Sequence, residues 1–142
     1  MAEVNHQETF DCTPQQFFDL LKDYESYPKF LNEVTSCRIV EDNGNEKMVE
    51  YKVSVVKSIT YINKQTETAP NEISWEFVKG DLFKKMKGHW KLEDVGGKTK
   101  ASYHISAEFG MFVPKMIVKT ALSANLPLMM KAHHKRVKEL YG

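Results

Sequence analysis

The sequence has few of the residues that cross-link or interrupt a chain. Its 142 residues include only two cysteines, five prolines and seven glycines. Cys12 and Cys37 do not have the spacing of a metal site or a redox motif. The longest mostly apolar run, 121–130, is far shorter than the roughly 20 residues of a membrane-spanning helix. The first ten residues lack the basic start and apolar run of a secretory signal. We therefore expect one cytoplasmic domain over residues 1–142.

Net charge is also nearly absent, at +1, but the charges are unevenly placed. Residues 1–50 carry eleven acidic and four basic side chains, whereas residues 111–142 carry six basic and one acidic. Two interpretations remain open. In the first, the uneven charges only make a solvated surface and have no function. In the second, the basic end of the molecule faces anionic lipid or RNA.

The period of the hydrophobic pattern changes along the chain. Residues 2–10 alternate weakly, as in a strand. Thr13-Pro14 then predicts a helix start, because threonine caps a first turn and the missing proline N–H costs nothing there. A second short helix is expected over 24–31. From Val34 the period is two, which predicts six further strands around 34–39, 49–55, 59–68, 73–77, 88–92 and 101–109.

Short turns such as Asn43-Gly44-Asn45 join these strands, so neighbours are expected to pair antiparallel. Each strand has one apolar and one polar face, which indicates a sheet covered on one side. The segment 113–141 has helical spacing and is the element expected to cover it. Pro127 divides it and predicts a kink or two abutting helices. The two expected apolar stripes are Ile117, Ala121, Ala124 and Leu128, and then Met130, His133, Val137 and Leu140.

Three stretches carry the motifs of a known superfamily. They are Thr13–Leu31, which ends in Tyr27-Pro28-Lys29-Phe30-Leu31; Val78–Leu92, with Gly80-Asp81-Leu82-Phe83 and Gly88-His89-Trp90; and Tyr103–Pro114. With them the chain resembles the helix-grip superfamily of START-type lipid carriers, birch-pollen-allergen-like proteins and polyketide cyclase/dehydrase proteins. It is most similar to the branch that holds the coenzyme Q-binding proteins and the ribosome-association toxins.

The resemblance implies an α+β helix-grip fold, a single START-like domain. A seven-stranded curved antiparallel sheet would wrap around a long C-terminal helix, with two short helices between strands 1 and 2. It also implies binding or transport of a hydrophobic small molecule, such as a lipid, an isoprenoid quinone or a polycyclic compound. Two alternatives stay open, because one fold hosts many functions: a polyketide aromatase/cyclase or dehydrase enzyme, and a ribosome-associating toxin-like module.

Residue sizes support a cavity between sheet and helix independently. The helical stretch 120–125 is rich in small residues, whereas the apolar phase of the strands carries large aromatic ones. Such surfaces either interlock into a solid core or leave an apolar pocket. In a pocket, the hydroxyls of Tyr51, Tyr61 and Tyr103 would orient a carbonyl or hydroxyl group of the bound ligand. We expect the pocket to be lined by Tyr51, Tyr61, Trp75, Phe77, Trp90, Tyr103, Ile105, Ile117, Ala121 and Ala124.

The sequence offers no catalytic constellation. His89 and His104 fall on the polar phase of their strands, and adjacent His133 and His134 lie about 100° apart on a helix, too far to share a metal readily. No nucleophile elbow or glycine-rich phosphate loop occurs. Arg38, one of two arginines, lies on the polar phase, which weakens the cyclase interpretation. We therefore expect no catalytic residue, no metal and no cofactor, and we favour a protein that is not an enzyme.

The segment 79–88 mixes apolar and basic side chains. We expect an amphipathic loop at the pocket mouth that contacts an anionic membrane; in the other interpretation its apolar residues cover the pocket. The nearby segment 109–114 is also apolar. The expected partners are thus a hydrophobic ligand, a peripheral anionic membrane and, with less support, a ribosome, but no DNA. The expected membrane-contact residues are Leu82, Phe83, Met86, Lys84, Lys85 and Lys87.

Overall fold

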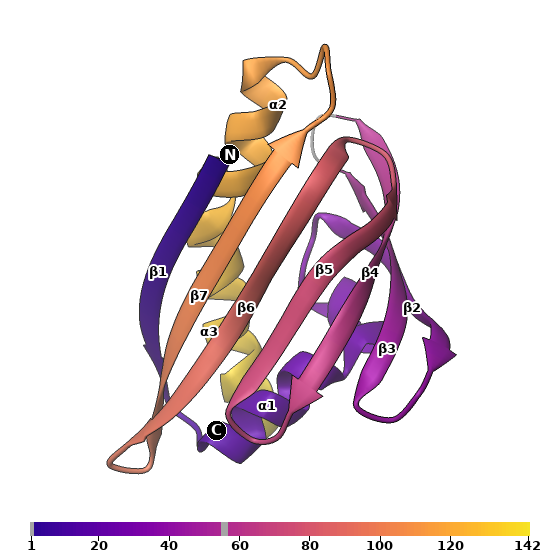
Figure 1. Ribbon diagram of the computed structural model, residues 1–142. Coiled ribbons are helices and arrows are strands. Elements are labelled where there is room, and N and C mark those ends of the chain that lie inside the picture. Colours follow the sequence, from indigo (N-terminus) through magenta and orange to yellow (C-terminus); the bar gives the residue numbers. More distant parts are fainter. Residues whose placement is uncertain (1, 55–56) are drawn as a thin grey trace.

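The chain folds into a strongly curved antiparallel sheet with helices on its concave side (Figure 1). The computed structural model describes residues 2–54 and 57–142, apart from the side chain of Ala121, so the expected strand residue Val55 lies outside the described residues. In sheet order β1-β7-β6-β5-β4-β3-β2, the seven strands of the described residues are β1 (Ala2–Phe10), β7 (Lys98–Phe109), β6 (Phe83–Val95), β5 (Glu72–Gly80), β4 (Ser58–Thr68), β3 (Glu46–Ser54) and β2 (Val34–Asp42). The expected helix-grip fold is confirmed.

Strand register brings the alternating apolar residues together on the concave face. Tyr51 pairs with Tyr61, and Trp90 pairs with Tyr103; paired residues of an antiparallel ladder point to the same side. From β2 to β7 each strand pairs with its neighbour in the chain, as a meander should. β1 instead pairs with β7, so the first and last strands lie side by side.

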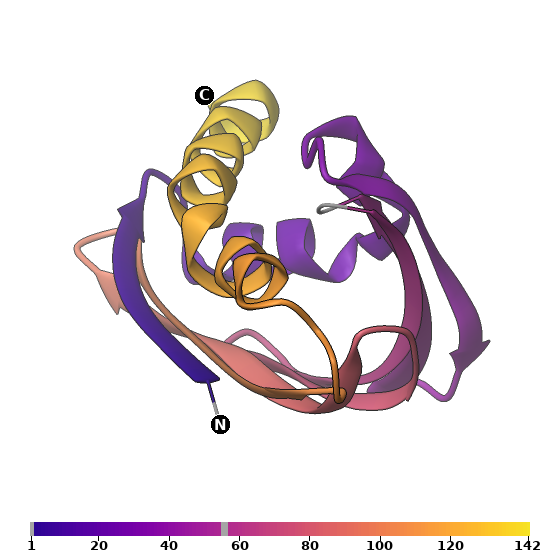
Figure 2. The same ribbon diagram turned by 90° about the horizontal axis from the view of Figure 1, so that it is seen from above.

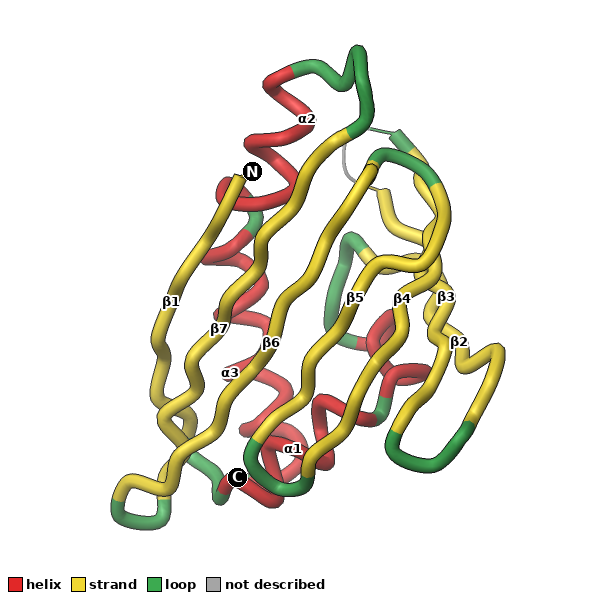
Figure 3. The backbone as a smooth tube through the Cα atoms, in the orientation of Figure 1, coloured by secondary structure: helices red, strands yellow, loops and turns green. Residues whose placement is uncertain are grey.

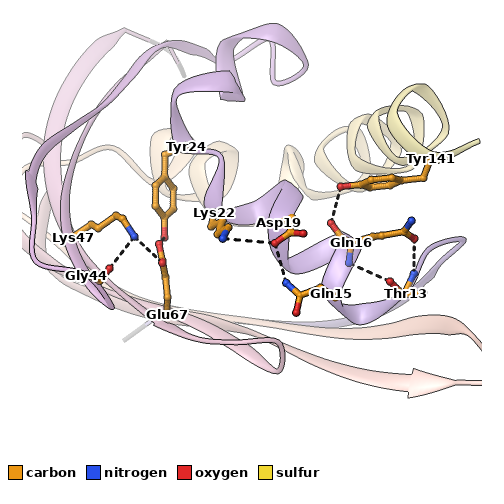
Figure 4. A network of polar contacts seen from close by, with 10 residues as sticks. All are labelled: Thr13, Gln15, Gln16, Asp19, Lys22, Tyr24, Gly44, Lys47, Glu67 and Tyr141. Carbon is orange, nitrogen blue, oxygen red and sulfur yellow. Dashed lines mark hydrogen bonds and ion pairs between the residues drawn. The ribbon is translucent and has the colours of Figure 1, made fainter.

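Two short helices follow β1, as expected: α1 (Pro14–Lys22) and the 3-10 helix η1 (Tyr24–Lys29). The start of α1 is a capping box, in which the Gln16 N–H donates to Thr13 Oγ1 at 3.2 Å and the Thr13 N–H donates to Gln16 Oε1 at 3.0 Å. The hydroxyl of Tyr141 donates to the Gln16 carbonyl at 2.9 Å (Figure 4). This bond fastens the end of the chain to α1.

The C-terminal segment is helical but not uniform. It consists of α2 (Lys115–Lys119), a π-helical turn η2 (Thr120–Ala124) and α3 (Leu126–Tyr141), with Pro127 in the first turn of α3. It runs lengthwise along the sheet, from α2 at one end to α1 at the other (Figure 3). Among the described residues, no helix is both long and apolar enough to cross a membrane.

The π-helical turn changes which side chains face the sheet. Met130, His133 and Val137 are buried as expected, whereas Ala124, Leu128 and the expected last stripe member Leu140 are exposed. The expected stripe that begins at Ile117 is therefore wrong at Ala124 and Leu128. A π-helical turn has more residues per turn than an α-helix, so it rotates everything that follows relative to a regular helix.

An ion pair lies on the concave side near η1. Lys47 Nζ is 2.7 Å from Glu67 Oε1 and donates to the Gly44 carbonyl at 2.9 Å. The Tyr24 hydroxyl donates to Glu67 Oε2 at 2.8 Å (Figure 4). Burial and the charge of Glu67 raise the pKa of Tyr24, so its hydroxyl stays a donor. Each oxygen of the Glu67 carboxylate thus has a partner. The network joins η1 to β3 and β4 and leaves no buried charge unpaired.

Candidate functional site

A cavity of about 240 Å³ lies between the concave face of the sheet and the C-terminal helical segment. Seen from above, that segment sits within the curve of the sheet (Figure 2). Strands β3 to β7 supply most of the wall, and the helical segment contributes Thr120, Leu122, Asn125, Met129 and His133. The lining is mainly apolar and aromatic with a few polar groups, the usual composition of a small-molecule site.

Many of the residues expected to line a pocket border this cavity: Tyr51, Tyr61, Trp75, Trp90, Tyr103 and Ile105. Phe77 does not, because its ring packs instead onto Phe83, 5.9 Å away between centroids. Ile117 is buried on α2, ahead of the π-helical turn, and is not part of the lining. Ala124 is exposed for the reason given above, and the Ala121 side chain lies outside the described part of the structure. Contact of these side chains with a ligand stays a prediction.

The aromatic wall has a defined packing. The Trp90 and Tyr103 rings are 4.8 Å apart, those of Trp75 and Tyr103 are 5.8 Å apart, and Tyr51 stacks on Tyr61 at 5.2 Å. Gly88 makes room for Trp75, because a Cβ at that position would lie 2.5 Å from the indole ring. The absence of a side chain at Gly88 therefore leaves the space that the indole of Trp75 occupies.

Two amides on β4 face the same cavity. Gln65 is 2% exposed, and its Oε1 accepts a hydrogen bond from the Tyr51 hydroxyl at 3.1 Å. Asn63 is 3% exposed, and its Oδ1 has no hydrogen-bond partner among the described residues. Sequence analysis missed both. The signal was present, since they continue the alternation of Ile59 and Tyr61 along β4.

His133 on α3 is the third polar residue of the lining that sequence analysis missed. It is 3% exposed, and its Nδ1 lies 2.7 Å from the Met129 carbonyl. A carbonyl oxygen only accepts, so Nδ1 carries the proton and Nε2 is left as an acceptor. Burial lowers the pKa of His133 from 6.5 to about 4, so the ring is neutral at physiological pH.

The described lining has one formally charged side chain. It is Glu33, half-buried just before β2. Burial and, to a smaller extent, the charge of Glu33 raise the pKa of the lining residues Tyr61 and Tyr103. The Glu33 carbonyl accepts from the N–H of Ser54, an exposed lining residue. His89 and His104 lie away from this cavity, their rings 5.3 Å apart on the outer face of the sheet. Arg38 is exposed and paired with Glu50 at 3.0 Å, which leaves the cavity without a guanidinium group.

The structure corrects the expected membrane loop. β6 already begins at Phe83, and its alternation turns Met86 inward, where it is 4% exposed and lines the cavity. Leu82 and Phe83 are half-buried and also border the cavity; the Phe83 ring lies 5.1 Å from that of Phe109. The expectation that these apolar side chains face solvent is therefore wrong. The lysines expected around them are exposed, namely Lys84, Lys85 and Lys87.

The exposed apolar cluster at this end of the molecule belongs to the next connection. Between β7 and the middle of α2, Met111 is 83% exposed, Phe112 95% and Met116 65%. The Gly110 N–H donates to the Leu82 carbonyl at 2.9 Å, which holds this connection against the β5–β6 turn. We call Met111, Phe112 and Met116 the apolar tip. Sequence analysis had placed this segment close to the pocket mouth but had not chosen it as the contact.

Comparison with known proteins gives relatives along the whole chain. The family model described as "Polyketide cyclase / dehydrase and lipid transport" matches residues 11–133. The ribosome association toxin RatA of Escherichia coli strain K12 is 25% identical over 144 residues, covering 100% of this chain and 90% of the toxin. The toxin of the same name from Rickettsia prowazekii is 23% identical and covers 99% of both chains.

Solved structures show the same fold. A START superfamily protein from Mycobacterium smegmatis superposes with a TM-score of 0.86 at 24% identity, covering 97% of this chain and 98% of that one. The Zhui aromatase/cyclase from Streptomyces sp. R1128 gives a TM-score of 0.87 at 12% identity, covering 97% and 94%. At such identities the likeness concerns the fold and carries no activity across.

Proposed function

This chain belongs to the polyketide cyclase / dehydrase and lipid transport family, and we propose that it binds a hydrophobic small molecule non-covalently and carries it. The observation that supports this most is the cavity of about 240 Å³, walled mainly by aromatic and apolar side chains. Burial of apolar ligand surface contributes roughly 25 cal/mol per Å². A lipid, an isoprenoid quinone or a polycyclic compound is the ligand class that such a wall accommodates.

The test is a pair of substitutions on the π-helical turn. Thr120 is half-buried and lines the cavity, whereas Ala124 on the same turn is exposed. Thr120→Trp should place an indole in the cavity and abolish binding of an apolar probe such as methoxynaphthalene, measured by isothermal titration calorimetry. Ala124→Trp should bind the probe like the wild type, because its indole lies outside. Native mass spectrometry of freshly purified protein should show a co-purified ligand in the wild type and not in Thr120→Trp.

Equal probe binding by both variants would show that the probe does not occupy this cavity. The melting temperature of each variant is measured in parallel. Overpacking of a filled core typically costs about 1–3 kcal/mol, so a large loss of stability in Thr120→Trp alone would indicate that the volume is not available to a ligand.

Association with ribosomes is a second candidate. The two RatA relatives bear the name of ribosome association toxins. In addition, α3 exposes Lys131, Lys135 and Lys138 at the spacing that places them on one helical face. Such a row of cations suits a phosphate backbone.

Co-sedimentation with bacterial ribosomes at low and high salt tests this candidate. Replacing Lys131, Lys135 and Lys138 together by glutamine should release the protein into the supernatant. A matched variant with Lys29, Lys52 and Lys91 replaced, all exposed elsewhere, should still sediment. A wild-type protein that stays in the supernatant at low salt rules the candidate out.

An enzymatic role has less support. The alternative called for a buried polar group with a shifted pKa, and His133 is such a group. However, its low pKa makes it a weak general base at neutral pH. In the described residues its hydrogen bond goes to a backbone carbonyl and not to a nucleophile.

Delivery of a carried ligand calls for a membrane contact, and we assign that role to the apolar tip rather than to Leu82, Phe83 and Met86. Lys115 and Lys119 are exposed within the same segment, and lysines near an anionic surface each contribute about 1 kcal/mol. A cytoplasmic site of action fits the two cysteines, which are buried and unpaired.

A further inference from the structure

The unpartnered oxygen of Asn63 is the feature of the cavity that the proposed function leaves unexplained. The residue is 3% exposed, lines the cavity and lies on a central strand of the sheet. Its Oδ1 accepts no hydrogen bond among the described residues. Buried polar side chains are nearly always hydrogen-bonded, so an orphan acceptor at a cavity wall indicates a missing donor.

The neighbouring strands do not supply that donor. Across the ladder, Asn63 is paired with Val49 on β3 and with Phe77 on β5, and neither side chain donates a hydrogen bond. The register between β4 and β5 shifts at this point, since Ile62 pairs with Lys79 while Asn63 pairs with Phe77. Such a bulge re-aims side chains and is common beside functional sites.

No other described residue donates to Asn63 Oδ1 either, although several hydroxyl, amide and indole donors line the same cavity. The Tyr51 hydroxyl already donates to Gln65 Oε1, and His133 Nδ1–H donates to the Met129 carbonyl. Glu33 is the formally charged side chain of the described lining, and its charge acts on the hydroxyls of Tyr61 and Tyr103. An anion in this cavity would find no opposite charge among the described lining residues, and a charge buried without a partner is strongly disfavoured.

Resting on the proposed function, we propose that the ligand is a neutral, mostly apolar alcohol or phenol whose hydroxyl donates to Asn63 Oδ1. The aromatic wall of Trp75, Trp90 and Tyr103 takes the apolar body. The side-chain amide of Asn63 binds the hydroxyl end of the ligand and so fixes its orientation in the cavity. A compound of the same shape with a methoxy or keto group in place of the hydroxyl leaves the acceptor unpaired and binds more weakly.

The experiment compares three probes of one shape by calorimetry: naphthol, methoxynaphthalene and acetonaphthone. The wild type should bind naphthol about tenfold more tightly than the other two, the ratio that one net hydrogen bond gives. In Asn63→Leu the three affinities should become equal within about twofold, chiefly through weaker naphthol binding. Asn5→Leu makes the same chemical change on an exposed position of β1 and should keep the wild-type ratio.

A readout without ligand accompanies the titrations. Asn63→Leu removes a buried acceptor atom that has no partner in the free protein, so the melting temperature of the free variant should equal or exceed that of the wild type. If Asn63→Leu fails to fold, the three probes are titrated into Asn63→Val instead. The ratio of naphthol affinity to methoxynaphthalene affinity in the wild type then remains the primary test. Equal binding of naphthol and its methyl ether by the wild type overturns hydroxyl recognition and leaves the cavity function standing. A preference for acetonaphthone overturns it too, because the amide N–H would then face the ligand. Binding of none of the probes overturns the hydroxyl proposal and the cavity function together.

Discussion

His133 is a titratable side chain surrounded by aromatic rings. Its ring centroid lies 5.3 Å from that of Phe30, 5.4 Å from Trp90, 6.1 Å from Phe17 and 6.5 Å from Phe10. These neighbours cannot solvate an imidazolium ion, so burial is the main cause of its lowered pKa, and the adjacent His134 lowers the pKa further.

We expect this histidine to make the protein less stable in mild acid. In the unfolded chain the ring binds a proton as the pH falls below about 6.5, whereas in the folded protein it does so only at about 4. The unfolded state therefore binds more protons in that window, and the free energy of unfolding decreases as the pH falls through it. The free energy of unfolding should fall by about 3 kcal/mol in total across this window, and His133 should cause no such loss above pH 7. Urea unfolding at a series of pH values measures it.

The variant His133→Leu isolates the contribution of this ring. Its free energy of unfolding should depend less on pH between about 6.5 and 4 than that of the wild type. His104→Gln, a change on the outer face of the sheet, leaves His133 in place and should keep the wild-type dependence. An unchanged dependence in His133→Leu would mean that water reaches the ring in the folded protein.

At the scale of elements, sequence motifs correctly predicted those helix ends and strands that depend on neighbouring residues in the chain. Thr13 and Pro14 predicted the start of α1, and the capping box with Gln16 is the physical reason. Alternation predicted a strand at each of the seven places where the described residues form one, although the first part of β6 was expected as a loop, and it placed Tyr51, Trp90 and Tyr103 on the concave face. Followed along β4, it would also have found Asn63 and Gln65, but polar residues in an inward phase are easily taken for solvent-facing ones.

The π-helical turn η2 could not be predicted in this way. Its sequence, Thr120–Ala124, has no proline and no glycine, and a stretch of small and aliphatic residues favours an ordinary α-helix. The sequence therefore carries no local signal that distinguishes this π-helical turn from an ordinary helical one. The exposure of Ala124 and Leu128, and with it the choice of cavity-lining residues, followed from this one turn.

At the scale of the whole molecule, the two ends of the sheet differ in character. The β6–β7 turn, α1 and the end of α3 lie at one end, and α2 with the apolar tip lies at the other (Figure 1). The β5–β6 turn, whose Leu82 and Phe83 border the cavity, is hydrogen-bonded to the connection that carries the tip. A membrane contact made by the tip would thus lie beside the cavity wall, where a ligand has the shortest path to lipid.

The membrane contact can be measured by co-sedimentation with vesicles. The wild type should bind vesicles that contain anionic phosphatidylserine, bind less at high salt, and ignore neutral phosphatidylcholine vesicles, because lysine attraction is screened by salt. Phe112→Asp, at the most exposed position of the tip, should abolish binding, because it replaces an inserting ring with a charge that the lipids repel. Leu140→Asp makes a similar change at the opposite end of the molecule, where Leu140 is 46% exposed, and should bind like the wild type. Equal loss in both variants would reduce the effect to net charge, and binding retained by Phe112→Asp would show that the apolar tip is not the surface that meets the membrane.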